Sequence, residues 1–292
     1  MTTATDARFE GKDGIELVGD LRGDPGDPLV VFLHGGGQTR HSWGGAAERV
    51  ARRGWWTLTL DARGHGESDW SESADYRLAS FAEDVRLVLS RFGGRPVIVG
   101  ASLGGLTAIL LAGELAPGTA GGVVLVDIVP NMEAAGAERI RAFMSDRATA
   151  GFGSLDEVAD AVAAYNPQRT RPADLSGLRR NLRARDGRLY WHWDPRFIDP
   201  LPGQGPEEIM DAPRLHEATR RLSADVSVLL VRGRSSDLVS ADKAAAFCAR
   251  FPRVGFVDVS GAGHMVAGDR NDAFTAAVVG FLERLAAPDR EP

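Results

Sequence analysis

The chain has 292 residues, 43% of them hydrophobic, with a formal net charge of −6 and a single cysteine. This length suffices for one large hydrophobic core, or for one core with an inserted subdomain. No basic run exceeds two arginines, which argues against a nucleic-acid partner, and no apolar stretch approaches the roughly 20 residues of a membrane span. The polar first ten residues do not form a signal peptide and one cysteine cannot form an internal disulfide, so we expect a cytoplasmic protein.

Strands and helices are predicted to alternate along the first 129 residues. Residues 7–22 predict a β-hairpin around Asp13-Gly14, and the unbroken apolar run 29–33 predicts a strand buried on both faces of a sheet. The pattern then predicts a helix over 42–53, a strand over 55–60, a helix capped by Ser80 with Glu83, a strand over 96–101 with a helix after it, and a strand over 122–128. Strict alternation with short links predicts a doubly wound, mostly parallel α/β sheet.

The alternation stops near Pro130 and resumes after about Arg214. Helices are predicted over 134–149, over 154–165 with a capping box at Ser154 and Glu157, over 175–183 and over 213–222. A strand over 227–231, a helix over 241–251, a strand over 255–259 and a helix over 273–286 then complete the alternating pattern. We therefore predict a core of residues 1–129 and 216–292, interrupted by a mainly helical cap of residues 130–215.

A serine lies where the predicted strand over 96–101 turns into its helix, in Gly100-Ala101-Ser102-Leu103-Gly104. This pentapeptide also fits a glycine-rich turn with a capping serine. The strand before it and the helix after it favour a nucleophile elbow, in which the sharp turn exposes the serine and the glycines allow a close crossing. The backbone N–H of Leu103 would then bind the oxyanion formed by attack on a carbonyl.

A nucleophilic serine needs a base and a group that orients the base. His264 follows the last predicted strand in a glycine-rich loop and is the predicted base. Two aspartates are candidates for the acid, Asp237 after the strand over 227–231 and Asp127 at the end of the strand over 122–128. We favour Asp237, because it gives the chain order serine, acid, histidine that is typical of a nucleophile elbow, and keep Asp127 as the alternative.

A glycine triplet follows the first buried strand, in His34-Gly35-Gly36-Gly37. Successive glycines let backbone N–H groups approach a ligand closely, so Gly36 is the predicted partner of Leu103 in an oxyanion hole, with Gly37 as the alternative. No lysine with serine or threonine follows the triplet, as a phosphate-binding loop would require. No metal-ligand pattern and no dinucleotide fingerprint is present, so neither a metal nor a cofactor is predicted.

These motifs, together with Asp61-Ala62-Arg63-Gly64-His65-Gly66-Glu67-Ser68, resemble the α/β-hydrolase superfamily over residues 29–264. The inserted segment resembles the helical cap of epoxide hydrolases, haloalkane dehalogenases and carbon–carbon hydrolases. In epoxide hydrolases and dehalogenases of this fold the elbow nucleophile is an aspartate. Ser102 therefore implies acyl transfer to water instead.

The resemblance implies hydrolysis of a small to medium hydrophobic ester or lactone through an acyl-enzyme. Alternatives are hydrolysis of a carbon–carbon bond in a vinylogous diketone, cofactor-free oxygen or perhydrolysis chemistry, and ligand binding without turnover. An arginine of the cap, Arg180, Arg183 or Arg188, could bind a substrate carboxylate. A homodimer is compatible with the sequence. The residues predicted to contact substrate, which could equally pack the cap on the core, are Trp43, Tyr190, Trp191, Trp193 and Met265.

Overall fold

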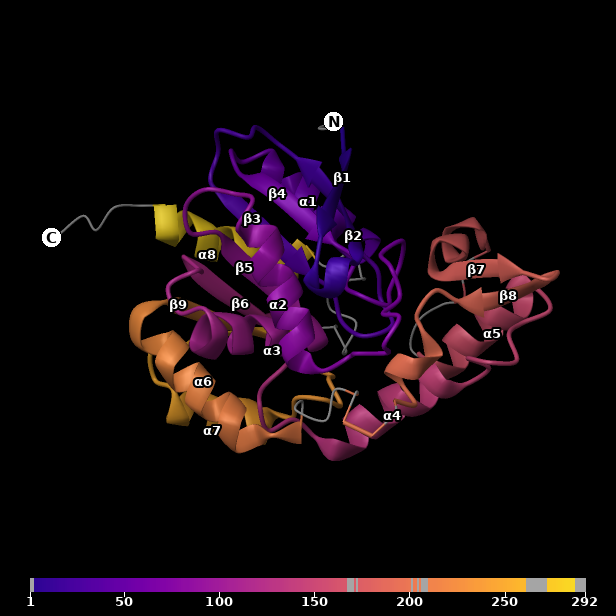
Figure 1. Ribbon diagram of the computed structural model, residues 1–292. Helices are drawn as coiled ribbons and strands as arrows, with labels where there is room; N and C mark the ends of the chain where they lie inside the picture. The colour runs from indigo at the N-terminus through magenta and orange to yellow at the C-terminus, as the bar shows by residue number, and fades with distance from the viewer. Residues whose placement is uncertain are drawn as a thin grey trace, which may run out of the picture.

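The computed structural model describes residues 3–166, 171, 173–200, 202–203, 205, 210–260 and 272–286. These residues contain an eight-stranded sheet in the order β1-β2-β4-β3-β5-β6-β9-β10, with helices on both faces (Figure 1). The strands are β1 Thr5–Glu10, β2 Glu16–Arg22, β3 Leu29–Leu33, β4 Trp56–Leu60, β5 Val97–Ala101, β6 Gly122–Val126, β9 Ser227–Gly233 and β10 Gly255–Val259. Only the pairs β1–β2 and β2–β4 of this sheet are antiparallel, so the predicted doubly wound, mostly parallel sheet is confirmed.

The central strands are apolar throughout because both faces of the sheet are covered. Val31 and Leu33 of β3 belong to the larger apolar cluster, whereas Val30 and Phe32 point to the other face and belong to the smaller one. Helices α2 Leu78–Leu89, α3 Leu103–Leu110, α6 Ala212–Asp225 and α7 Ala241–Arg250 contribute to the larger cluster, and α1 Gly44–Ala51 and α8 Asp272–Ala286 to the smaller. The unbroken apolar strands thus follow from burial on two sides.

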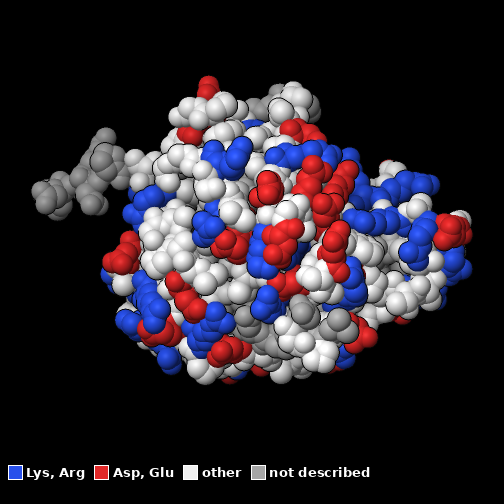
Figure 2. Space-filling view, in the orientation of Figure 1, with Lys and Arg blue, Asp and Glu red and all other residues white. Residues whose placement is uncertain are grey.

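The segment between β6 and α6 extends to one side of the sheet (right in Figure 1). It contains α4 Ala134–Ser145, α5 Leu155–Tyr165, the two-stranded hairpin β7 Leu182–Arg185 and β8 Arg188–Trp191, and the 3₁₀ turns η4 Ser176–Asn181 and η5 Pro195–Phe197. We call this segment the cap. Figure 2 shows Lys and Arg side chains gathered over the β7–β8 end of the cap, beside a band of acidic side chains on the core.

Two local predictions are wrong. Ser80 lies inside α2 rather than at its N-cap, which is Arg77, because the Arg77 carbonyl already accepts hydrogen bonds from the Ser80 and Phe81 N–H groups. Residues 175–183 form only a 3₁₀ turn that runs into the β7–β8 hairpin, so the cap is not helical throughout. By contrast, Ser154 caps α5 as predicted, accepting a hydrogen bond from the Glu157 N–H at 3.2 Å.

The predicted boundary between cap and core at residue 215 falls inside α6. This helix packs against the π-helical turn η3 Leu111–Leu115, which follows α3 directly. A Cβ on Gly113 would stand 2.1 Å from the Ala218 carbonyl oxygen, and Arg214 pairs with Glu114 at 2.7 Å. The whole of α6 therefore lies against the helices of the core. No helix in the part of the chain that the structure describes is long and apolar enough to cross a membrane.

Candidate active site

Ser102 occupies the turn between β5 and α3 in a strained backbone conformation, with φ 46° and ψ −114°. A positive φ is rare for a residue with a side chain and is typical of functional sites. The Ser102 N–H donates to the Val126 carbonyl at 3.1 Å, and the Ser102 carbonyl accepts hydrogen bonds from Gly105 and Leu106. These bonds fix the turn on both sides of the serine.

The glycines beside Ser102 are required by the close crossing of strand and helix, as the sequence predicts. A Cβ on Gly100 would stand 2.4 Å from the Gly104 carbonyl carbon, and a Cβ on Gly104 would stand 2.4 Å from the Leu33 carbonyl oxygen. Neither position tolerates a side chain without movement of the backbone. The crossing therefore holds α3 directly behind the serine.

Between Pro96 and Gly113 every residue is buried except Ser102, which is partly exposed. It lines a cavity of about 300 Å³ together with Gly36 and Leu103. The N–H of Leu103 heads α3, where the backbone N–H groups of a helix have no partner within the helix. The cavity therefore contains a serine hydroxyl and both predicted oxyanion-hole residues.

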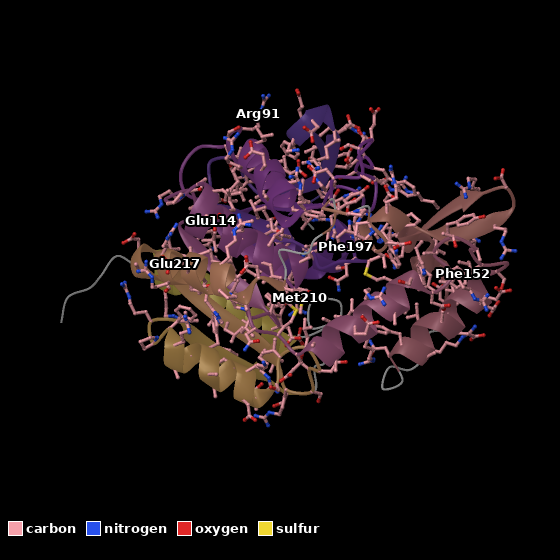
Figure 3. The ribbon with its side chains drawn as sticks, turned by 60° about the horizontal axis from the view of Figure 1, so that its bottom comes forward. Arg91, Glu114, Phe152, Phe197, Met210 and Glu217 are labelled. Atoms are coloured by element: carbon pink, nitrogen blue, oxygen red, sulfur yellow. The ribbon has the colours of Figure 1, made fainter. Side chains whose placement is uncertain are left out.

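The rest of the described cavity wall is mostly apolar and comes largely from the cap. In Figure 3, Phe197 and Met210 are labelled between the core helices and α4, whereas Phe152 lies at the far end of the cap. These lining residues were not among the predicted substrate contacts. A signal was present, because one face of α4 repeats apolar side chains at helical spacing, Ala137, Ile140 and Met144, all of which line the cavity.

The loop after β3 carries Gly35, Gly36 and Gly37 past the serine. A Cβ on Gly35 would stand 3.3 Å from the Ser102 Cβ. The Gln38 side chain accepts from the Gly35 N–H at 3.0 Å, and the Gln38 N–H donates to the Gly35 carbonyl at 3.1 Å. Gly37 has φ +73°, and Met144 of α4 lies against it. The loop is thus a closed turn held against both Ser102 and the cap.

Asp127 lies at the carboxyl end of β6, beside the serine strand. Its side chain is buried and its φ is 50°. One carboxylate oxygen accepts from the Gly233 N–H at 3.0 Å and the other from the Ser236 hydroxyl at 2.6 Å. The loop after β9 therefore wraps around this carboxylate.

Asp237 lies in the same loop but faces the cap. Its side chain is 37% exposed and forms an ion pair with Arg139 of α4. The Arg139 guanidinium also donates to the Tyr165 carbonyl and lies over the Tyr165 ring, 4.8 Å from its centroid. The two candidate acids thus differ in environment, Asp127 being buried in the core and Asp237 being paired across to the cap.

His264 and Met265, the predicted base and one predicted substrate contact, lie outside the described residues. Their roles stay predictions.

The four predicted substrate-binding aromatics do not line the described cavity. Trp43 is fully buried between Phe32 and Phe274 on the other face of the sheet. Trp191 and Trp193 stack on each other at 4.8 Å inside the cap, and Tyr190 lies under the Arg185 guanidinium. Large aromatic surfaces are here used for packing.

The arginines considered for a substrate carboxylate are also placed elsewhere. Arg183 donates to the Gly66 carbonyl at 2.9 Å, and Arg188 donates to the Ala150 and Gly151 carbonyls. Arg180 is exposed on η4. The cavity wall instead contains Arg141 of α4, whose side chain pairs with Glu138 at 2.8 Å.

Three buried histidines lie side by side behind the glycine loop. The ring of His65 lies 5.3 Å from that of His34 and 5.8 Å from that of His192, which belongs to the cap. Burial lowers the pKa of His34 to about 4 and that of His65 to about 3, and lowers the pKa of His192 well below its usual value. We call these three residues the histidine column; all of them are neutral at pH 7. No group of His, Cys, Asp and Glu suited to a metal ion occurs among the described residues.

Comparisons with known proteins agree with this architecture. Residues 28–270 match the family model described as the alpha/beta hydrolase fold. The chain is 33% identical over 280 residues to the esterase Rv0045c of Mycobacterium tuberculosis, covering 90% of this chain and 85% of that protein. It is 31% identical over 268 residues to the sn-1-specific diacylglycerol lipase ABHD11 of Mus musculus, covering 90% and 83% of the two chains.

A solved structure supports the same assignment. The crystal structure of an alpha/beta hydrolase from Novosphingobium aromaticivorans superposes with a TM-score of 0.80 at 27% identity, covering 97% of this chain and 99% of that one. The match of the family model covers most of the sequence and includes six strands of the sheet, β3, β4, β5, β6, β9 and β10, with the serine turn. The chain therefore belongs to the α/β-hydrolase fold family.

Proposed function

We propose that the protein is a serine hydrolase that cleaves small to medium hydrophobic carboxylic esters or lactones through an acyl-enzyme. The observation that carries this proposal is the shared cavity of Ser102, Leu103 and Gly36. A strained serine, the free N–H groups at the start of a helix and a glycine loop are the parts that acyl transfer requires. Two relatives named as an esterase and a lipase support the same reaction class.

In the proposed mechanism the Ser102 hydroxyl attacks the substrate carbonyl while His264 takes its proton. The N–H groups of Leu103 and Gly36 bind the oxyanion of the tetrahedral intermediate. His264 then gives the proton to the leaving alcohol, which departs and leaves an acyl group on Ser102. A water molecule, deprotonated by His264, releases the acid and restores the serine.

We assign the acid that orients His264 to Asp127, with Asp237 as the alternative. Two observations support Asp127. It is buried next to the serine strand, and the Gly233 N–H and the Ser236 hydroxyl keep its carboxylate in a fixed position. The Asp237 carboxylate is turned to Arg139 of the cap. A buried, fixed carboxylate is better suited to stabilising an imidazolium than a half-exposed one in an ion pair.

The described cavity wall favours an uncharged acyl chain. Ile140, Met144 and Phe197 present apolar surface from the cap to the serine, and Leu106 does so from the core. Methionine side chains adapt to ligands of different shape. We therefore expect substrates with short to medium apolar acyl groups.

The test is hydrolysis of p-nitrophenyl esters from acetate to decanoate by the wild type, Ser102→Ala and the control Ser90→Ala. Ser90 is an exposed serine at the end of α2 whose hydroxyl donates to the Leu87 carbonyl. We expect Ser102→Ala to lose roughly 10³-fold or more in kcat, and Ser90→Ala to match the wild type. The acyl chain length that gives the highest kcat/KM would indicate the length of acyl group that the cavity accommodates.

Other outcomes would assign the protein differently. Undiminished turnover in Ser102→Ala would contradict the proposed mechanism. Reaction of Ser102 with a fluorophosphonate, without turnover of any ester or lactone, would favour the carbon–carbon hydrolase alternative, to be tested with a vinylogous diketone. Absence of both turnover and labelling would favour ligand binding.

A further inference from the structure

The histidine column reaches the glycine loop from two directions. His34 directly precedes the loop, whereas His192 follows β8 and comes from the cap. His65 lies between them in the loop after β4 and packs edge-on against Phe197 at 5.0 Å. All three are 2% exposed or less, and the proposed mechanism uses none of them.

The backbone donors around His192 determine which of its ring nitrogens carries the proton. Nδ1 lies 2.7 Å from the backbone nitrogen of Gly66, and a backbone N–H can only donate. Nδ1 must therefore accept, and in the neutral ring the proton is on Nε2. Nε2 lies 3.3 Å from the Gly37 carbonyl oxygen, so the ring donates to that carbonyl.

His34 binds the same loop, and a backbone donor likewise determines which of its ring nitrogens carries the proton. Its Nε2 accepts from the Ala62 N–H at 3.0 Å, so its protonated Nδ1 donates to the Gly35 carbonyl at 2.8 Å. In a planar trans peptide the carbonyl and the following N–H point in opposite directions. Holding the Gly35 carbonyl on the histidine side thus directs the Gly36 N–H away from it, and Gly36 lines the cavity with Ser102.

We propose that His192 is a positioning residue that sets the oxyanion loop from the cap, by holding the Gly37 carbonyl while His34 holds that of Gly35. This inference rests on the proposed function, because it concerns the Gly36 N–H of the same site. Two rings then fix the peptide that precedes Gly36 and the peptide that follows Gly37. Docking of the cap hairpin therefore also positions the oxyanion loop, since His192 bonds to Gly37 only when β8 is docked beside Gly66.

Two substitutions separate the two hydrogen bonds of His192. An asparagine amide reaches the place of Nδ1, two bonds beyond Cβ, and a glutamine amide reaches the place of Nε2, three bonds beyond Cβ. His192→Gln keeps a donor for the Gly37 carbonyl and loses the acceptor for Gly66. His192→Asn keeps the acceptor and loses the donor. Each of these two variants therefore serves as the matched control for the other.

We expect His192→Asn to lower kcat by about 10- to 100-fold with little change in KM, because the oxyanion is stabilised chiefly in the transition state. His192→Gln should stay within about threefold of the wild type in kcat. Affinity for a trifluoromethyl ketone, which forms a tetrahedral adduct, should fall in parallel with kcat. His216→Gln on α6, outside the site, should leave all three quantities unchanged.

Equal losses in the Asn and Gln variants, or a loss confined to KM, would overturn the positioning role. A wild-type enzyme that is inactive on esters and whose Ser102 is not labelled would instead overturn the proposed function. A measurement on the wild type does not depend on any variant folding. Imidazole ¹⁵N NMR should show His192 as the Nε2–H tautomer, and finding the Nδ1–H tautomer would contradict the proposal.

Discussion

At the scale of single residues, chemistry depends on surroundings that the chain order does not reveal. Asp127 and Asp237 both follow a strand of the parallel sheet, and the order serine, acid, histidine favours Asp237. In the structure Asp127 is held by Gly233 and Ser236, whereas Asp237 pairs with Arg139. The partner of each carboxylate comes from a segment about 100 residues away in the chain, so no local pattern identifies it.

Substitution of each aspartate by asparagine distinguishes the two candidates. Asp127→Asn keeps an oxygen for the Gly233 N–H, so the fold should survive, yet the amide cannot stabilise an imidazolium. We expect kcat for p-nitrophenyl ester hydrolysis to fall roughly 10³- to 10⁴-fold. Asp237→Asn removes only a half-exposed ion pair and should cost less than about tenfold.

The measurement is steady-state kinetics of both variants, with circular dichroism to verify folding. A large loss in Asp237→Asn together with a small loss in Asp127→Asn would return the acid to Asp237. Similar large losses in both would show that the whole loop after β9, rather than one carboxylate, supports His264.

At the scale of elements, the serine turn is a packing arrangement of β3, β5 and α3. Gly100 and Gly104 let α3 start in contact with the backbone of β5 and of β3. The sequence predicts this crossing, because glycine pairs at an elbow have a steric role that can be seen without coordinates. The identity of the neighbouring backbone, Leu33, follows only from the strand order.

Gly104→Ala tests the crossing. Its Cβ would stand 2.4 Å from the Leu33 carbonyl oxygen, so strand and helix must separate. We expect the free energy of unfolding to fall by about 1–3 kcal/mol in urea titrations, with loss of esterase activity. Gly93→Ala is the matched control, because a Cβ there meets nothing within 4 Å, and it should leave stability unchanged or slightly higher. A Gly104→Ala variant as stable as this control would contradict the geometry.

At the scale of the whole molecule, buried and partly buried polar contacts join cap and core. The Tyr76 hydroxyl donates to the Asp194 carboxylate at 2.5 Å, and the Glu133 carboxylate accepts from the Ser240 hydroxyl at 2.6 Å. The histidine column also joins cap and core, through the hydrogen bonds of His192 with Gly66 and Gly37, and burial lowers the pKa of each of its three members. Docking of the cap on the core therefore favours the neutral form of the histidines.

This linkage predicts a loss of stability at mildly acidic pH. The unfolded chain takes up protons on these histidines near pH 6.5, whereas the folded protein does so only at lower pH, about pH 4 for His34. The unfolded state thus binds more protons in this window, and the free energy of unfolding should be constant above pH 6.5 and decline below it. Each such histidine contributes a slope of up to about 1.4 kcal/mol per pH unit.

Urea titrations between about pH 7.5 and pH 5 check the expected slope, above the range in which most carboxylates titrate. His192→Gln should reduce the slope, because one of the three groups is gone, whereas His216→Gln should change it less. Stability independent of pH across this range would contradict the prediction, because it would mean that the folded and unfolded states bind the same number of protons.

The amino-acid pattern alone predicts the sheet, the serine turn and the glycine loop. Apolar runs, helical periodicity and steric glycines act over a few residues, and local physics fixes their structure. It did not predict the β7–β8 hairpin or the cavity-lining face of α4, and it left open whether Trp43, Trp191 and Trp193 contact substrate or pack.

Contacts between side chains that are distant in the sequence depend on the folded arrangement of the whole chain. His192 and Gly37 are 155 residues apart and Asp127 and Ser236 are 109 apart, yet each pair forms a hydrogen bond. Such contacts depend on how the cap and the loops dock onto the sheet. Docking is set by the summed packing of many segments, which no short stretch of sequence encodes.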